Sequence, residues 1–273
     1  MGKMTGNEFF VKALREEGVD KIFGYPGACV VDIFDEIYKQ NDVDLILPRH
    51  EQGLIHAAEG YARSTGKPGV CLVTSGPGAT NLVTGIADAN LDSVPLVCFT
   101  GQVSTGLIGN DTFQEVDIVG ITRNITKYSM MVRDRSELNK AIKEAFFIAT
   151  SGRPGPVLVD LPKDVMAQSG SDEYPETVNL RGYKPNTKVH DGQIKRAIKM
   201  IYKAKRPLFI LGGGVKIAGA ADDMRKLMEE TGIPTVTTIM GKGSVPTNHE
   251  LYFGNVGMHG CFAANNAVNN CDQ

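Results

Sequence analysis

The chain has 273 residues, of which 42% are hydrophobic and 22% are charged, as in a typical globular protein. Its 29 Lys and Arg residues nearly balance 31 Asp and Glu residues, so the net charge of -2 gives no electrostatic reason to expect nucleic acid or an anionic membrane as a partner. No run approaches the roughly 18 apolar residues of a membrane span, and the N-terminus has no apolar segment of a secretory signal.

The five cysteines are odd in number, widely spaced and without a CxxC pair: Cys29, Cys71, Cys98, Cys261 and Cys271. Cys71 and Cys98 lie inside apolar runs, where a thiol acts as a small hydrophobic group. We therefore expect all five to be reduced, and the protein to be cytoplasmic.

Apolar runs and helical periodicity alternate over residues 1–165. The pattern predicts helices at 5–17, 30–40 and 51–65, then one ending near residue 90 and one at 136–150. It predicts strands at 20–24, 45–47, 69–74, 95–100, 128–132 and 156–162. Thr5 and Glu8 have the spacing of a capping box for the first helix. This alternation predicts an α/β domain with a six-stranded, doubly wound parallel sheet and right-handed crossovers.

Residues 166–189 are polar and unpatterned, which predicts a linker between domains. Residues 190–273 then predict a second α/β domain with helices at 191–204, 220–232 and 261–270. Only two strands are clear there, at 207–211 and 234–238, and sheets commonly have four to six. We therefore expect an incomplete, Rossmann-like second domain and a chain that is a fragment of a longer protein.

Glu51 follows a short strand directly and opens a helix. In an open α/β sheet, ligands bind at the carboxyl ends of the strands, although an acidic residue in a first helical turn is also favoured by the helix dipole alone. Gly76-Pro77-Gly78 precedes another helix, where it is either a tight turn or a place for close ligand approach. The chain has no G-x-G-x-x-G fingerprint. His50, His56 and Glu59 do not form HExxH, and no Cys/His cluster has metal-ligand spacing.

Eight segments together resemble the thiamine-diphosphate-dependent 2-keto-acid enzymes, and among them the catalytic subunits of acetolactate (acetohydroxyacid) synthases. They are residues 23–27 (FGYPG), 49–52 (RHEQ), 58–63 (AEGYAR), 74–81 (TSGPGATN), 113–115 (FQE), 152–157 (GRPGPV), 160–164 (DLPKD) and 257–260 (GMHG). The resemblance extends over the whole chain in order.

The resemblance implies that Glu51 faces the N1′ atom of the cofactor's aminopyrimidine ring and helps to activate thiazolium C2. It implies a thiamine site that also contains Tyr25, Pro26, Gly27, Thr74, Pro77 and Asn81. It places Phe113 and Gln114 near the reacting carbons, with Gln114 as a second catalytic residue, and Lys163 at the substrate access. The implied substrates are pyruvate and a second 2-keto acid, pyruvate or 2-ketobutyrate.

The same resemblance implies a non-redox FAD, bound by Arg153, Gly212, Gly213, Gly214, Thr238, Ile239, Met258 and His259. The family binds the diphosphate through Mg²⁺ with a Gly-Asp-Gly motif in a third domain, and this motif is absent here, so we expect no Mg²⁺ ligands in this chain and no activity from it alone. The implied partners are further copies of the chain, in a dimer or tetramer formed through the first domain, and a regulatory small subunit. Two alternatives stay open: an oxidase or decarboxylase of the same superfamily, and a non-catalytic module that serves dimerisation or cofactor binding.

Overall fold

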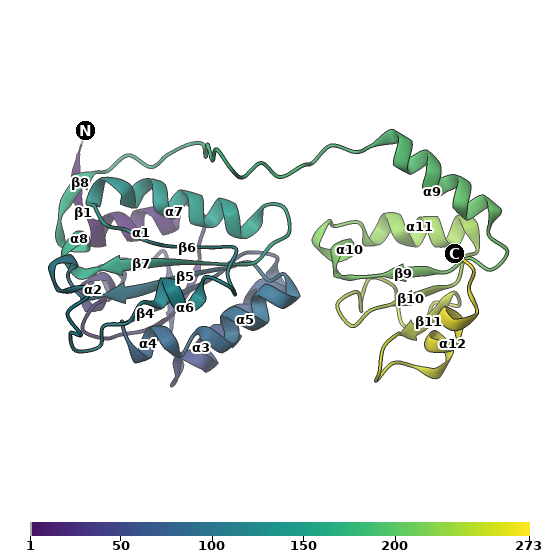
Figure 1. Ribbon diagram of the computed structural model, residues 1–273, viewed down its shortest axis with the longest axis horizontal. Helices are drawn as coiled ribbons and strands as arrows, with labels where there is room; N and C mark the ends of the chain where they lie inside the picture. Colours follow the sequence, from purple (N-terminus) through teal and green to yellow (C-terminus); the bar gives the residue numbers. More distant parts are fainter. Residues whose placement is uncertain (1) are drawn as a thin grey trace. The chain divides into compact units, whose positions relative to one another are not determined.

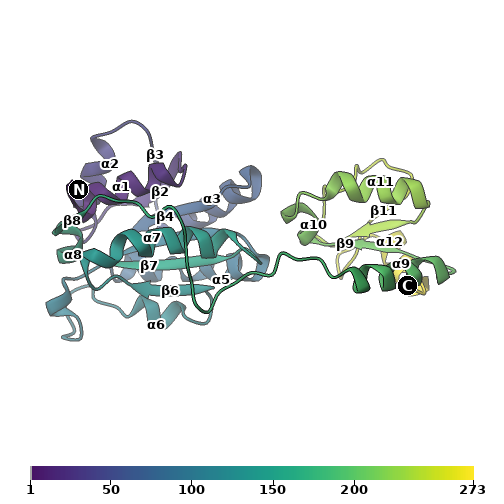
Figure 2. The same cartoon turned by 90° about the horizontal axis from the view of Figure 1, so that it is seen from above.

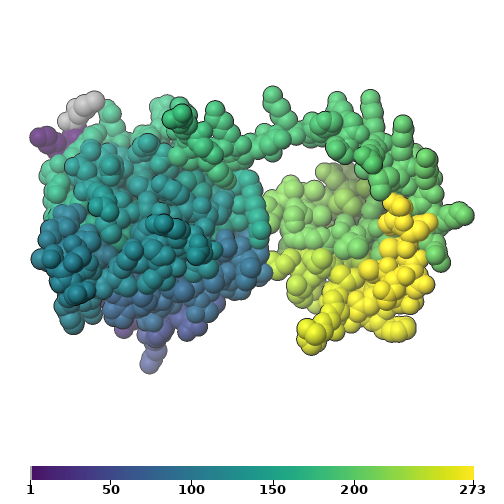
Figure 3. All heavy atoms as spheres, viewed as in Figure 1, coloured from purple at the N-terminus to yellow at the C-terminus, as the bar shows by residue number. Residues whose placement is uncertain are grey.

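The computed structural model describes residues 2–273 and contains two compact units, unit 1 (Met1–Asn186) and unit 2 (Thr187–Gln273). Each is a closely packed body with its own parallel sheet (Figures 1 and 3). Within residues 2–273, no helix has both the length and the apolar character needed to cross a membrane.

Unit 1 is built on a six-stranded parallel sheet with the strand order β3-β2-β4-β5-β7-β6. Its strands are β2 (Lys21–Tyr25), β3 (Asp44–Ile46), β4 (Gly69–Val73), β5 (Leu96–Gln102), β6 (Tyr128–Met131) and β7 (Pro156–Pro162). The central strands β4, β5 and β7 are buried along their whole length, as their continuous apolar sequences require in a sheet covered on both faces. The predicted six-stranded α/β sheet is confirmed.

Helices cover both faces of this sheet (Figure 1). The helices of unit 1 are α1 (Gly6–Glu16), α2 (Val31–Tyr38), α3 (Glu51–Thr65), α4 (Pro77–Thr80), α5 (Val83–Asp92), α6 (Ile118–Thr122), α7 (Arg135–Thr150) and α8 (Lys163–Ala167), with a 3₁₀ turn η1 (Thr105–Leu107). Helices α1, α2 and α7 pack on one face and contribute Phe10, Ile33 and Ile142 to the larger core. Helices α3 and α5 pack on the other face, where Ile55 and Ile86 are fully buried.

The first helix begins at the predicted capping box. The Thr5 hydroxyl accepts a hydrogen bond from the Glu8 backbone N–H at 3.2 Å, and the Glu8 carboxylate accepts one from the Thr5 N–H at 2.8 Å. This reciprocal pair satisfies two backbone donors that a helix start leaves without partners.

Part of the segment expected to be a linker packs against unit 1 instead. Strand β8 (Ser169–Ser171) pairs antiparallel with β1 (Lys3–Thr5), so these two strands lie side by side although they are far apart in the sequence (Figures 1 and 2). The Tyr174 ring lies next to the Phe9 ring at a tilt of 41°, and its hydroxyl donates a hydrogen bond to the Glu17 carboxylate at 2.7 Å. Such a short strand is held by backbone hydrogen bonds, which leave no hydrophobic pattern in the sequence.

Unit 2 has a three-stranded parallel sheet with the order β11-β10-β9, where the sequence pattern indicated two strands. Its elements are α9 (Asp191–Lys203), β9 (Phe209–Leu211), α10 (Gly213–Ile217), α11 (Ala221–Thr231), β10 (Thr235–Thr237), β11 (Tyr252–Asn255) and α12 (Phe262–Asn270). The sequence YFGN of β11 has no alternation and contains Gly and Asn, which are rare in strands, so the pattern missed it. Helix α12 packs on β11, the strand that precedes it in the chain.

Candidate functional site

The order of the strands locates the place where a ligand would bind in unit 1. The chain passes from β2 to β3 on one side of β2 and returns to β4 on its other side, so the direction of winding changes between β2 and β4. In open α/β sheets, ligands bind outside the carboxyl ends of the strands at such a switch point. The turns that follow β2 and β4 therefore flank the expected site.

Glu51 is the first residue of α3, after the neighbouring strand β3. The helix is capped by His50, whose Nδ1 accepts a hydrogen bond from the Gln52 N–H at 3.1 Å, so Glu51 is not needed as a cap. Its half-buried carboxylate turns toward the loop after β4, where Glu51 Oε2 accepts a hydrogen bond from Asn81 Nδ2 at 2.9 Å. A side chain held in this way has a defined orientation, which a purely dipolar role would not require.

The turn after β4 brings backbone close to this carboxylate. A Cβ atom added at Gly78 would lie 3.5 Å from Glu51 Oε1 and 2.8 Å from Thr74 Cγ2, so a side chain would crowd the space between these two residues. Gly76 has a φ of +58° and lies against Gln114, where an added Cβ would meet the Gln114 carbonyl oxygen at 2.6 Å. Glycine is thus required at positions 76 and 78, because a Cβ atom there would collide with neighbouring residues of the protein.

The turn after β2 packs against the turn after β4. A Cβ at Gly27 would lie 2.5 Å from Thr74 Cβ, and the backbone N–H of Cys29 donates to Thr74 Oγ1 at 3.4 Å. The Cys29 thiol and the Ser75 hydroxyl are 3.2 Å apart. Tyr25 ends β2 opposite Val73 of β4, so Tyr25, Pro26 and Gly27 share the edge of the sheet that holds Thr74 and Pro77.

The loop after β5 is ordered by its own acidic residue. The Glu115 carboxylate accepts hydrogen bonds from the backbone N–H groups of Gly109 and Thr112, and these bonds lower its pKa. Gln114 has a φ of +62°, rare for a residue with a side chain, and its backbone lies over Gly76. Phe113 is 83% exposed, so its ring is free to contact a ligand.

Lys163, the first residue of α8, connects the carboxyl end of β7 to the turn after β2. Its ammonium group donates to the Ala28 carbonyl oxygen at 3.0 Å and lies 3.8 Å from the Asp32 carboxylate. The structure therefore brings the residues of the implied thiamine and substrate sites in unit 1 to one edge of one sheet.

The residues of the implied FAD site in unit 2 also share one edge. Gly212, Gly213 and Gly214 follow β9, Thr238 and Ile239 follow β10, and Met258 and His259 follow β11. Because the three strands are parallel, these loops leave the same edge of the sheet. Arg153 lies in unit 1, where its guanidinium donates to Ser93 Oγ at 2.7 Å and to the Leu91 carbonyl at 2.9 Å.

Sequence reasoning missed a buried carboxyl group on β7 of unit 1. Asp160 on β7 is fully buried, and burial raises its pKa to about 7. Thr100 Oγ1 donates to one of its oxygens at 2.7 Å, and Gln102 Nε2 donates to the other at 3.0 Å. The only signal in the sequence was an acidic residue inside an apolar strand.

Comparison with known proteins gives two matches of the same family. Residues 4–121 match the thiamine pyrophosphate enzyme N-terminal TPP binding domain, and residues 194–273 match the thiamine pyrophosphate enzyme central domain. Thiamine pyrophosphate is the same compound as thiamine diphosphate.

Curated relatives match almost the whole chain. It is 50% identical to the acetolactate synthase large subunit of Corynebacterium glutamicum over 99% of this chain and 43% of that protein. It is 46% identical to the acetolactate synthase isozyme 3 large subunit of Escherichia coli over 100% of this chain and 48% of that protein. It is 51% identical to the probable acetolactate synthase large subunit of Methanocaldococcus jannaschii over 98% of this chain and 46% of that protein.

The chain thus spans less than half the length of each of these relatives. The match to the N-terminal domain lies in unit 1, and the match to the central domain lies in unit 2. The parallel sheet of unit 1, its switch point and the held carboxylate agree with a domain that binds a cofactor there. The chain belongs to the thiamine pyrophosphate enzymes, with their N-terminal cofactor-binding domain in unit 1 and their central domain in unit 2.

Proposed function

We propose that this chain is the part of an acetolactate synthase large subunit that binds the aminopyrimidine ring of thiamine diphosphate. The observation that carries the proposal is the Glu51 carboxylate, half-buried beside the switch point and held by Asn81 at 2.9 Å. The identity of about 50% to acetolactate synthase large subunits supports the reaction class.

The geometry suits a carboxylate that exchanges a proton with a ring nitrogen. Asn81 donates to Oε2 and so orients the group, whereas within residues 2–273 no hydrogen bond is made to Oε1. Gly78 keeps the space beside Oε1 free of a side chain. In this proposal, Glu51 Oε1 shares a proton with N1′ of the aminopyrimidine ring, and Asn81 fixes the angle of approach.

Bound thiamine diphosphate supplies the carbon centre that adds to the carbonyl group of a 2-keto acid and stabilises negative charge after carbon dioxide leaves. The chain's own residues position the cofactor and the substrates. Tyr25, Pro26, Gly27, Thr74 and Pro77 would line the ring site, since the turns that carry them meet at one sheet edge.

Substrate residues in the proposal come from two other loops at the same edge. Gln114, fixed over Gly76, would orient the keto acid near the reacting carbons, and the exposed ring of Phe113 would shield it from water. Lys163, beside Ala28, would attract the substrate carboxylate. Pyruvate is the proposed donor, and pyruvate or 2-ketobutyrate the acceptor.

Further ligands and partners are proposed on the basis of the family. Mg²⁺ would be held, with the diphosphate, by residues outside this chain. A non-redox FAD would bind at the carboxyl edge of the unit 2 sheet, where Gly214 and Met258 border open space and Met258 is 92% exposed. The proposal also includes a homodimer or tetramer formed through unit 1, a small regulatory subunit and a cytoplasmic location. The smaller partner is supported by the relatives, which are large subunits.

Saturation-transfer NMR with thiamine diphosphate and Mg²⁺ tests the binding step on this chain. We expect the pyrimidine protons to receive magnetisation from the protein, and Glu51→Gln to reduce that transfer several-fold. Glu137→Gln is the matched control, because Glu137 is also an acidic residue in the first turn of a unit 1 helix. Equal transfer in wild type and Glu51→Gln would remove Glu51 from the site.

The reaction is tested by supplying pyruvate to the same mixture and, in parallel, to a longer protein that contains this sequence. Acetolactate that is formed by wild type and lost in Glu51→Gln supports the synthase. Acetaldehyde in place of acetolactate would point to a decarboxylase, and peroxide formed with oxygen would point to an oxidase.

A further inference from the structure

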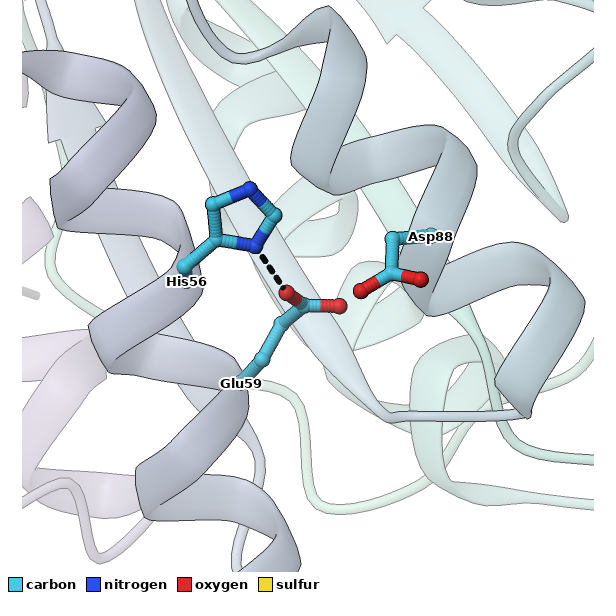
Figure 4. Close-up of side chains that lie close together, drawn as sticks. All are labelled: His56, Glu59 and Asp88. Atoms are coloured by element: carbon cyan, nitrogen blue, oxygen red, sulfur yellow. Dashed lines mark hydrogen bonds and ion pairs between the residues drawn. The ribbon is translucent and has the colours of Figure 1, made fainter. Parts of the chain in front are cut away.

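Three side chains between α3 and α5 converge without a role in the proposed reaction. His56 and Glu59 come from α3, and Asp88 comes from α5 (Figure 4). One ligand atom from each residue lies within 4.8 Å of the others. His56 Nδ1 and Glu59 Oε2 are joined by a hydrogen bond of 2.6 Å.

The second observation is an oxygen atom of Glu59 that has no partner. Glu59 is only 3% exposed, and its Oε1 makes no hydrogen bond within residues 2–273. Figure 4 shows this oxygen turned toward the carboxylate of Asp88. A buried carboxylate oxygen without a partner costs free energy, and an adjacent second carboxylate raises that cost.

The environment of Glu59 favours neutralisation of its charge. Burial raises the pKa of Glu59, and the negative charge of Asp88 raises it further, whereas the hydrogen bond from His56 and the charges of His56 and Arg63 act in the opposite direction. Arg63 is bonded to Asp92 at 2.7 Å. Either a proton or a cation placed between Glu59 and Asp88 would relieve the repulsion.

The donor set selects a cation of a particular kind. One imidazole nitrogen and two carboxylates suit Zn²⁺ and related transition ions, whereas Mg²⁺ and Ca²⁺ prefer oxygen ligands alone. His56 and Asp88 are exposed, so an ion can reach the cluster from solvent.

We propose that His56, Glu59 and Asp88 form a binding site for a divalent transition-metal ion of the Zn²⁺ type that joins α3 to α5. This site is separate from Glu51, which lies five residues before His56 and eight before Glu59 on α3, about 8 Å and 12 Å along the helix axis. Because α3 carries Glu51 and Asn81 lies just before α5, an ion bound here stabilises the pair of helices that borders the Glu51–Asn81 contact.

The test is a Zn²⁺ titration of the metal-free chain, followed through the imidazole nitrogens of its five histidines by NMR. The exposed thiol of Cys261 is first blocked with iodoacetamide, since thiolates compete for Zn²⁺. We expect the His56 signals, assigned with His56→Gln, to shift first and to saturate at one ion per chain.

Asp88→Asn and Glu59→Gln should each weaken Zn²⁺ binding at least tenfold. Asp88 is exposed, so its variant tests the site even if the buried Glu59→Gln substitution unfolds the protein. Glu229→Gln is the matched control, because it removes a carboxylate 3.3 Å from His249, a pair that has no third metal-ligating side chain among residues 2–273. The proposal is overturned if another histidine responds at lower Zn²⁺, or if Asp88→Asn binds Zn²⁺ as wild type does.

Discussion

The buried carboxyl group of Asp160 makes the stability of unit 1 depend on pH in an unusual direction. Asp160 is fully buried on β7, and burial raises its pKa from an ordinary 3.8 to about 7, which outweighs the hydrogen bonds from Thr100 and Gln102. The negative charge of Asp117 acts in the same direction as burial. The folded protein therefore keeps a proton on Asp160 that the unfolded chain releases.

The size of the effect follows from the difference between the two pKa values. About 3 pKa units correspond to about 4 kcal/mol, at 1.36 kcal/mol for each unit. Between pH 4 and pH 7 the folded state binds more protons than the unfolded state, so the free energy of unfolding decreases as the pH rises. The full destabilisation of the folded state by Asp160 is present above pH 7 and disappears below about pH 4.

Asp160→Asn removes the charge and retains the hydrogen bonds. The amide oxygen can accept from Gln102, and the amide N–H can donate to the Thr100 hydroxyl, which is able to reverse its role. We expect this variant to be more stable than wild type by about 4 kcal/mol at pH 8. This advantage should be roughly 2.5 kcal/mol smaller at pH 5.

Mass spectrometry measures the hydrogen exchange of the β5 amides in increasing urea at pH 5 and pH 8. Because β5 belongs to unit 1, this measurement reports the stability of unit 1 separately from that of unit 2. Asp111→Asn is the matched control, since Asp111 is exposed and has a φ of +53° that Asn tolerates equally well. The reasoning fails if Asp160→Asn has the same advantage at both pH values, or if it is less stable than wild type at pH 8.

Three further substitutions test local contacts. Gly76→Ala should lower the free energy of unfolding by about 1–3 kcal/mol, because φ is +58° and the new Cβ meets Gln114. The same substitution should weaken thiamine diphosphate binding. Chemical denaturation measures the first effect, and ligand titration measures the second. Thr5→Ala should cost about 1 kcal/mol through loss of the capping box, as read from urea midpoints, and an unchanged midpoint would contradict the cap. Tyr174→Phe removes the hydrogen bond to Glu17 and should lower the free energy of unfolding by about 1 kcal/mol. Proteolysis near residue 174 should become faster. An equal rate of proteolysis would mean that this hydrogen bond does not fix the segment to the rest of unit 1.

Local sequence patterns were sufficient for the main elements of unit 1. The strands β4, β5 and β7 are continuous apolar runs between glycine and proline turns, and α3 begins at Glu51 and ends at Thr65 as predicted. These features depend on side-chain periodicity and turn chemistry over a few residues, which the sequence displays directly. The capping box of α1 is of the same kind, since Thr5 and Glu8 are three residues apart.

Contacts between distant residues required the folded structure. Strand β11 was missed because its sequence YFGN has no strand pattern and only its pairing with β10 makes it a strand, and β8 because its partner β1 is more than 160 residues away. The same limit applies to Asp88, which has no sequence relation to His56 and Glu59 until α3 and α5 pack on one face of the sheet.

Glu51 shows most clearly which properties the sequence reveals and which require the folded structure. Its place at the end of a strand and the start of a helix can be read from the sequence. The sequence does not reveal whether Glu51 is only an acidic residue favoured by the helix dipole. That question depends on the distance from Glu51 to Asn81 and Gly78, which lie about 30 residues later in the chain. The parallel sheet brings these residues together, because the carboxyl ends of parallel strands meet at one edge.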